Sequence, residues 1–234
     1  QIEVAYEIKD YANVCLAPQT NWPLAGFPYD EIGHQLELNS GINEVELAKK
    51  IVEICWNHYA NIQQPIAISA INLDKLNSLK DCVINIYNNL SASLPTQELG
   101  ALRSGVQTIP IIGYIPHFCD DYVDLGDFIK MLDDLHRNKE TEDFLKAYNN
   151  MVLLSKYVGD SFAKTTGLTV WFPDSYPQFK QLVNNYTNLD WSQSKWVNFL
   201  NWFYNKDDIR PTDINMQTGQ PEENNDFWLS WSKS

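Results

Sequence analysis

Short apolar runs separated by long amphipathic stretches restrict this chain to helices packed on a sheet. Three runs of five to seven residues are apolar enough for buried strands: "NVCLA" (13–17), "IAISAI" (66–71) and "GLTVWFP" (167–173). The proline that closes the third run ends that strand. Between these runs, apolar residues recur at helical spacing. Strands that alternate with helices through short connections predict an α/β protein of one domain, with the three runs in a common sheet and helices on both faces.

The helices are predicted from apolar stripes that step by three and four residues. The longest stripe runs from Leu73 to Leu90. Asn43 with Glu46, and Asp190 with Gln193, have the spacing of capping boxes at the start of two further helices. The expected helical stretches cover residues 2–9, 43–55, 73–90, 95–106, 125–135, 144–155 and 190–203.

Composition excludes several functions. The chain has 234 residues and a formal charge of −13, which would repel nucleic acid. No apolar run approaches the roughly 20 residues of a membrane span. The globular part is expected over residues 1–204, followed by a polar tail over 205–234 in which "FWLSW" is a candidate final strand.

The cysteines give no evidence of a metal site. Cys15, Cys55, Cys82 and Cys119 are widely spaced and include no CxxC pair, so a structural zinc site is not expected. They resemble single buried thiols, with one or two disulfides as the alternative. No cofactor is expected, and calcium has no supporting motif.

The segment "PHFCDD" (116–121) is the most obvious group of reactive residues. A thiolate–imidazole pair activates a nucleophile, and His117 and Cys119 lie two residues apart. Such pairs, however, come from separate elements that converge in space. We interpret the segment as a solvated acidic turn with Asp120 and Asp121. His34 and His136 have no convincing partner in sequence, so the residues alone provide no catalytic nucleophile.

Several stretches together resemble the clostripain family of cysteine peptidases. The resemblance starts with "QIEVAYEIKDYANVCLAPQTNWPLAGFPYDEI" (1–32) and continues through "AISAINLDKL", "YVDLGDFIKML", "GLTVWFP" and "WVNFLNWF". These motifs occur in the family's order and reach about residue 204. The resemblance implies a caspase-like three-layer α/β/α sandwich, of which this chain is the C-terminal part.

The same resemblance implies a Cys–His dyad that lies upstream of this chain. The nucleophile would precede Gln1 by about four residues, and the histidine would come earlier still, so no catalytic residue is expected within residues 1–234. The expected partners are therefore a peptide or protein substrate and an N-terminal segment or chain of the same enzyme. That segment would also complete the sheet.

The loop between the first strand and the next helix is expected to contact substrate near P1. Its candidate residues are Trp22, Leu24, Ala25, Tyr29 and Asp30. Bulky aromatic side chains on a loop suit the wall of a cleft, although they can equally anchor the loop to a neighbouring helix. Family members that cleave after Arg or Lys commonly have an acidic residue where this chain has Ala25. A buried cation needs a counter-charge, so a small or apolar P1 residue is expected.

Two other functions remain open from the sequence. The chain is acidic and has eight tryptophans, which is compatible with a non-catalytic extracellular binding module that stacks sugars on exposed rings. An inactive peptidase homologue is the second alternative. In each case the resemblance implies a secreted or cell-surface bacterial protein.

Overall fold

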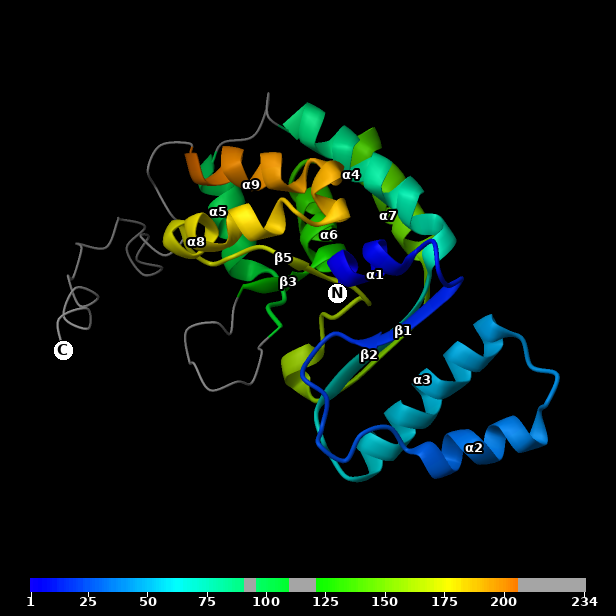
Figure 1. The fold of residues 1–234 in the computed structure, drawn as a ribbon. Helices are drawn as coiled ribbons and strands as arrows, with labels where there is room; N and C mark the ends of the chain where they lie inside the picture. Colours follow the sequence, from blue (N-terminus) through cyan, green and yellow to red (C-terminus); the bar gives the residue numbers. More distant parts are fainter. Residues whose placement is uncertain (91–95, 110–120, 206–234) are drawn as a thin grey trace.

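The main sheet has three strands in the order β1–β2–β4, and both neighbouring pairs are antiparallel. This computed structural model describes residues 1–90, 96–109 and 121–205 (Figure 1). The strands of the main sheet are β1 (Val14–Pro18), β2 (Ile66–Asn72) and β4 (Val152–Val158). The predictions of strands at 13–17 and 66–71 are therefore confirmed.

Strand β2 lies at the centre because both of its faces are apolar. Ile66, Ile68 and Ala70 belong to one hydrophobic cluster, whereas Ile71 belongs to a second. Successive side chains of a strand point to opposite faces, so a continuous run of buried residues requires cover on both sides. Ser69 is also fully buried, and its hydroxyl donates to the carbonyl of Gly167.

One face of the main sheet is covered by α3 (Glu44–Asn61), beside which lies α2 (Tyr29–Leu38). The predicted helix start at Asn43 is confirmed, because its side chain accepts the Glu46 N–H at 3.0 Å. Ala48, Val52, Cys55 and Tyr59 turn toward β2 and form the smaller cluster. In Figure 1, α2 and α3 occupy the lower part of the molecule, apart from the other helices.

The opposite face carries the larger hydrophobic core, and helices that predominantly follow the predicted stripes build it. The helix after β2 begins with a short 3₁₀ turn, η1 (Leu73–Lys75). The α-helices on this side are α1 (Ile2–Ile8), α4 (Leu76–Leu90), α5 (Thr96–Gly105), α6 (Leu125–Leu135), α7 (Lys139–Met151), α8 (Tyr176–Tyr186) and α9 (Trp196–Asn205). The mixed α/β class, with helices on both faces of the sheet, is thus confirmed.

The third predicted strand exists but does not join the main sheet, which corrects the expectation of a common sheet. It is β5 (Thr169–Trp171), and it pairs antiparallel with β3 (Tyr122–Asp124), a strand that the sequence did not predict. The first turn of α1 lies along β5, and Glu3 accepts the Trp171 N–H at 2.7 Å. A helix therefore occupies the edge through which β5 would have paired with the main sheet.

A second correction concerns residues 144–155, which were expected to form one helix. Helix α7 ends at Met151, and residues 152–158 form strand β4. Positions 148, 151, 152 and 155 satisfy helical spacing, but the segment "VLLSKYV" is rich in β-branched and aromatic residues and pairs with β2 along its length. Tertiary pairing overrides the helical stripe here.

A third correction concerns Asp190, which does not cap the last helix. Residues Asp190–Ser194 form a separate 3₁₀ turn, η3, and Lys195 then adopts a left-handed conformation with φ of 67°. Helix α9 begins after that break. The expected tail, apart from Asn205, lies outside the described residues, and so do "FWLSW" and the pair His117 and Cys119.

Candidate functional site

The loop between β1 and α2 is held by an aromatic cluster as well as by backbone hydrogen bonds from Gly26 to Pro23 and from Tyr29 to Phe27. Trp22 stacks on Phe27 with ring centroids 4.8 Å apart, and it meets Tyr59 of α3 edge-on at 5.3 Å. The Tyr59 hydroxyl donates to the carbonyl of Gly26, whose φ of 77° suits a glycine in a tight turn. These rings pack on the smaller hydrophobic cluster. In this structure Trp22 and Phe27 therefore anchor the loop.

The other predicted substrate residues lie on the surface of the same loop. Leu24 is fully exposed, Ala25 and Asp30 are exposed, and Tyr29 is 70% exposed at the start of α2. The structure thus separates the predicted set into a partly buried anchor, Trp22, and an exposed tip. Contact of the tip with substrate stays a prediction.

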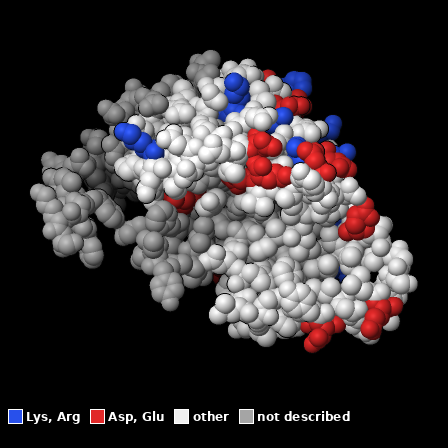
Figure 2. Space-filling view, viewed as in Figure 1, with Lys and Arg blue, Asp and Glu red and all other residues white. Residues whose placement is uncertain are grey.

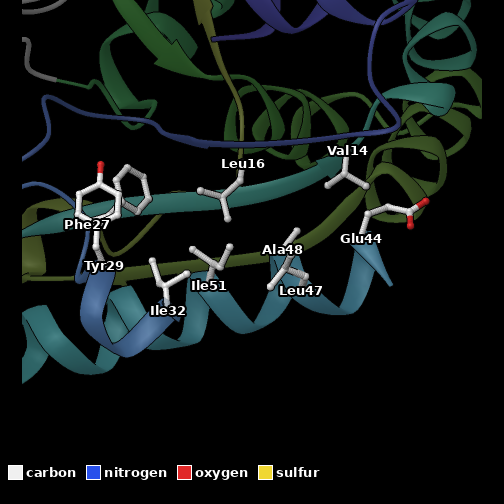
Figure 3. Close-up of a pocket in the computed structure, with 9 residues that line it drawn as sticks. All are labelled: Val14, Leu16, Phe27, Tyr29, Ile32, Glu44, Leu47, Ala48 and Ile51. Atoms are coloured by element: carbon white, nitrogen blue, oxygen red, sulfur yellow. The ribbon is translucent and has the colours of Figure 1, made fainter. Parts of the chain in front are cut away.

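An apolar cavity of about 340 Å³ lies on one side of this loop, between β1, α2 and α3. Figure 3 shows Tyr29, Phe27 and Ile32 at one end and Glu44 at the other. The lining residues are Val14, Leu16, Phe27, Tyr29, Ile32, Glu44, Leu47, Ala48 and Ile51. With Glu44 as its one charged lining residue among those described, this cavity offers few polar groups to a peptide backbone.

A second cavity of about 330 Å³ lies at the other end of the loop and has a mixed lining. It is enclosed by α1, β1, the start of the loop and the β3–β5 pair. The lining residues are Gln1, Val4, Ala5, Cys15, Ala17, Pro18, Gln19, Thr20, Asn21, Ile109, Tyr122 and Thr169. Amide and hydroxyl groups beside small apolar side chains are what an extended peptide needs for orientation and for van der Waals contact. This cavity, here called the α1 pocket, is the better candidate for substrate.

The surroundings of the α1 pocket carry little charge. None of its described lining residues is Asp, Glu, Lys or Arg. Figure 2 shows that the surface over β1 and the segment leading to α2 is largely uncharged on this face, whereas acidic and basic side chains gather over α4 and α7. The pocket therefore lacks a charge that would favour a charged ligand.

A buried carboxylate supports the floor of the α1 pocket. Gln19 is 6% exposed, and its Nε2 donates to Asp124 Oδ2 at 2.9 Å. Asp124 also accepts the N–H of Asp127 at 2.8 Å, the N–H of Thr166 at 2.7 Å and the Thr166 hydroxyl. Burial raises the pKa of Asp124, and these donors oppose that rise. The network ties the loop to the β3–β5 pair.

The described cysteines are neutral thiols rather than nucleophiles. Cys15 lines the α1 pocket, but the described lining includes no histidine or carboxylate that could deprotonate it. Burial raises the pKa of Cys15 and Cys82, and it raises the pKa of Cys55 to about 12. Among the residues that the structure describes, no cluster of three His, Cys, Asp or Glu side chains could hold a metal ion. None of the described helices is both long enough and apolar enough to cross a bilayer.

The fold is that of the caspase-like C11 proteases. The chain superposes on an inactive zymogen C11 protease from Parabacteroides distasonis with a TM-score of 0.63 and 17% identity, covering 82% of this chain and 54% of that one. A clostripain from Bacteroides thetaiotaomicron in complex with a peptide inhibitor matches with a TM-score of 0.62 and 18% identity, over 83% of this chain and 81% of that one. A secreted C11 cysteine protease from the same organism matches with a TM-score of 0.62 and 19% identity, over 83% of this chain and 52% of that one. This chain thus spans about half the length of two of these three proteins.

The family follows from the sequence itself. The clostripain family matches residues 1–203, which is nearly all of the chain that the structure describes. The chain belongs to the clostripain family, Peptidase_C11, a family of cysteine proteases. A comparison with curated protein sequences finds no match.

Several residues around the α1 pocket were missed by the sequence analysis. Gln1, Gln19, Asp124 and Thr169 are polar residues inside or beside segments that read as strands or helix ends. Their side chains meet only because the β3–β5 pair approaches β1, and no local pattern indicates that approach. The one available signal was Asp124, a carboxylate set between apolar residues in "YVDLGDF".

Proposed function

We propose that the complete protein hydrolyses peptide bonds with a Cys–His dyad carried by a segment upstream of Gln1. Membership of a cysteine peptidase family over residues 1–203 is the observation that supports this most directly. The geometry adds a reason for the location. Gln1 is the residue just before α1, and it lines the α1 pocket. A cysteine about four residues before it would therefore lie within reach of a peptide bound there.

In this proposal the upstream histidine takes the thiol proton and the thiolate attacks the scissile carbonyl. The acyl-enzyme that forms is then hydrolysed by water. The residues of this chain bind and orient the peptide. The amide of Asn21 and the hydroxyl of Thr20 are proposed to hydrogen-bond its backbone, while Ala17 and Pro18 leave space for side chains. No cofactor is needed for this chemistry.

The upstream segment is also proposed to extend the main sheet beside β1. Gln19 donates to Ala67 and Leu73 donates to Asn13, both at 2.9 Å, so residues at odd positions of β1 are the ones that bond to β2. In an antiparallel pair the residues between them direct their backbone groups to the other side. The backbone of Val14 and Leu16 therefore faces an edge along which no strand lies in the described part of the chain. A companion strand would satisfy these groups.

Substrate choice is proposed to exclude basic P1 residues. Ala25 is at the exposed tip of the loop, where family members that cleave after Arg or Lys have an acidic residue. Without a partner, burying a guanidinium or ammonium costs on the order of 3–5 kcal/mol. We therefore propose a small or apolar P1 residue. We also propose that the protein is secreted or at the cell surface and acts on peptides or proteins, in keeping with the description of a relative as secreted.

A Trp-rich binding module has less support. Trp171, Trp191 and Trp196 are each at most 3% exposed and pack in the larger core, so they offer no platform for stacking sugars. An inactive homologue is distinguished by experiment.

The test is a peptide-library profile of the full-length protein, with and without prior treatment with iodoacetamide. Turnover that alkylation abolishes, with a preference for apolar or small P1 residues, is expected. The Ala25→Asp variant should shift the profile toward Arg and Lys. Absence of turnover on every peptide would contradict peptidase function, and strong wild-type preference for Arg or Lys would contradict the role of Ala25.

A further inference from the structure

The first turn of α1 is fixed by a carboxylate that bonds to the far end of the chain. Glu3 is 6% exposed, and its Oε1 accepts the Trp171 N–H at 2.7 Å and the Tyr186 hydroxyl at 2.9 Å. Its Oε2 lies 3.1 Å from the backbone nitrogen of Gln1. One side chain thus joins α1, β5 and α8 through contacts that span 168 and 183 residues of sequence.

This carboxylate takes the place of a neighbouring strand. One edge of β5 pairs with β3, and on the other edge the Trp171 N–H bonds to Glu3 while the Thr169 N–H points to Gln1 Oε1 at 3.4 Å. A buried backbone N–H needs an acceptor, and an ionised carboxylate is a strong one. The first turn of α1 is therefore held in one position relative to β5.

Gln1 links the first turn of α1 to the main sheet through hydrogen bonds. Its Nε2 donates to the carbonyl of Ala17 in β1 at 3.0 Å and to the hydroxyl of Ser69 in β2 at 3.3 Å. Gln1, Ala17 and Thr169 all line the α1 pocket. The direction from which the preceding chain reaches the pocket thus depends on the turn that Glu3 holds.

We propose that Glu3 is a positioning residue, which fixes the approach of the chain before Gln1 to the α1 pocket and hence the place of the nucleophile. This inference rests on the proposed function. Misplacing a reacting group by about 1 Å can cost on the order of a hundredfold in rate. Loss of Glu3 should therefore reduce turnover without a matching loss of substrate binding.

Two controls separate positioning from stability. Glu7, one turn along α1, accepts the Asp190 N–H at 2.6 Å but does not line the pocket. Asp133 in α6 is 5% exposed and accepts the Thr141 hydroxyl at 2.6 Å, so it is a buried carboxylate that does not line the α1 pocket. Glu7→Gln tests the same helix, and Asp133→Asn tests the general cost of changing a buried carboxylate.

The experiment measures kcat, KM and the melting temperature of the full-length enzyme. Glu3→Gln keeps one oxygen for the Trp171 N–H and the Tyr186 hydroxyl but replaces the carboxylate by a neutral amide, which is a weaker acceptor. We expect kcat to fall at least tenfold with KM unchanged within about twofold. Glu7→Gln should keep kcat within twofold, and Asp133→Asn should lower the melting temperature with kcat retained.

Tyr186→Phe provides a milder variant in case Glu3→Gln does not fold. It removes one donor to Glu3 and should lower kcat severalfold, again without raising KM. The inference is overturned if Glu3→Gln or Tyr186→Phe folds and retains wild-type kcat, or if Glu3→Gln changes kcat no more than Asp133→Asn does. A wild-type enzyme that hydrolyses no peptide would instead contradict the proposed function on which the inference depends.

Discussion

At the residue scale, two buried carboxylates are held by several hydrogen bonds each. Asp124 accepts from four donors and Glu3 from two distant elements, and both lie beside the α1 pocket. The described thiols behave differently, since partial or full burial raises the pKa of each and keeps it neutral. The two buried carboxylates thus have several hydrogen-bond partners beside the α1 pocket, whereas burial disfavours the charged form of each thiol.

Cys55 should be the least reactive of the described thiols. Burial raises its pKa from 9.0 to about 12, so at pH 8 its thiolate fraction is far below that of an exposed cysteine. With iodoacetamide at pH 8, Cys82 should be alkylated well before Cys55, as followed by mass spectrometry of tryptic peptides. Faster modification of Cys55 in the folded protein would contradict its placement in the core.

The same shift has a consequence for stability. A folded pKa above the unfolded value means that Cys55 favours folding below about pH 9 and that this contribution is lost as the pH rises toward 12. The free energy of unfolding of wild type should fall more steeply between pH 9 and 12 than that of Cys55→Ala. Urea titrations at these pH values measure the difference, and equal slopes would refute it.

At the element scale, two helical glycines differ in whether the surrounding atoms leave room for a side chain. A Cβ on Gly126 of α6 would lie 2.3 Å from Thr166 Oγ1 and 2.8 Å from the Tyr148 ring, whereas one on Gly33 of α2 would meet nothing within 4 Å. Gly126→Ala should therefore lower the free energy of unfolding by about 1–3 kcal/mol. Gly33→Ala should raise it by about 0.5–1 kcal/mol through helix propensity. Thermal and urea unfolding of both variants provides the measurement.

The loop before α2 gives a second contrast between neighbouring residues. Trp22 packs against Phe27 and Tyr59, so Trp22→Ala should lower the free energy of unfolding by about 2–3 kcal/mol. Leu24 is fully exposed, and Leu24→Ala should change the free energy of unfolding by less than about 0.5 kcal/mol. Urea unfolding monitored by tyrosine and tryptophan fluorescence tests both. Equal effects would show that Trp22 is not the anchor of the loop.

Helices and strands were predictable from the sequence where the apolar residues followed a single periodicity, either helical or strand-like. The stripe from Leu73 to Leu90 buries Leu76, Leu79 and Val83 as expected, because helix spacing and burial agree there. Strand β4 was missed because its first residues continue the stripe of α7, and β3 was missed because three residues carry too little pattern. Of the site, the loop was located in advance, but the α1 pocket depends on pairing between distant segments.

At the scale of the whole molecule, β1 and β4 are the edge strands of the main sheet, and β2 is paired on both sides. If the proposed upstream segment pairs with β1, amide hydrogen exchange at Val14 and Leu16 should slow by tenfold or more in the complete protein relative to this chain alone. Exchange at residues 66–71 should change little and is the internal control. Equal protection of β1 with and without the upstream segment would contradict a companion strand at this edge.

The contacts of α1 also bear on the order in which the molecule is made. Glu3 bonds to residues 171 and 186, Glu7 bonds to residue 190, and Tyr6 packs edge-on against Trp191 at 5.5 Å. During synthesis at roughly 5–20 residues per second, these partners emerge from the ribosome on the order of ten seconds or more after α1. Until then the helix lacks these late partners. The part of the molecule that we propose to position the nucleophile is thus translated well before the residues that hold it in place.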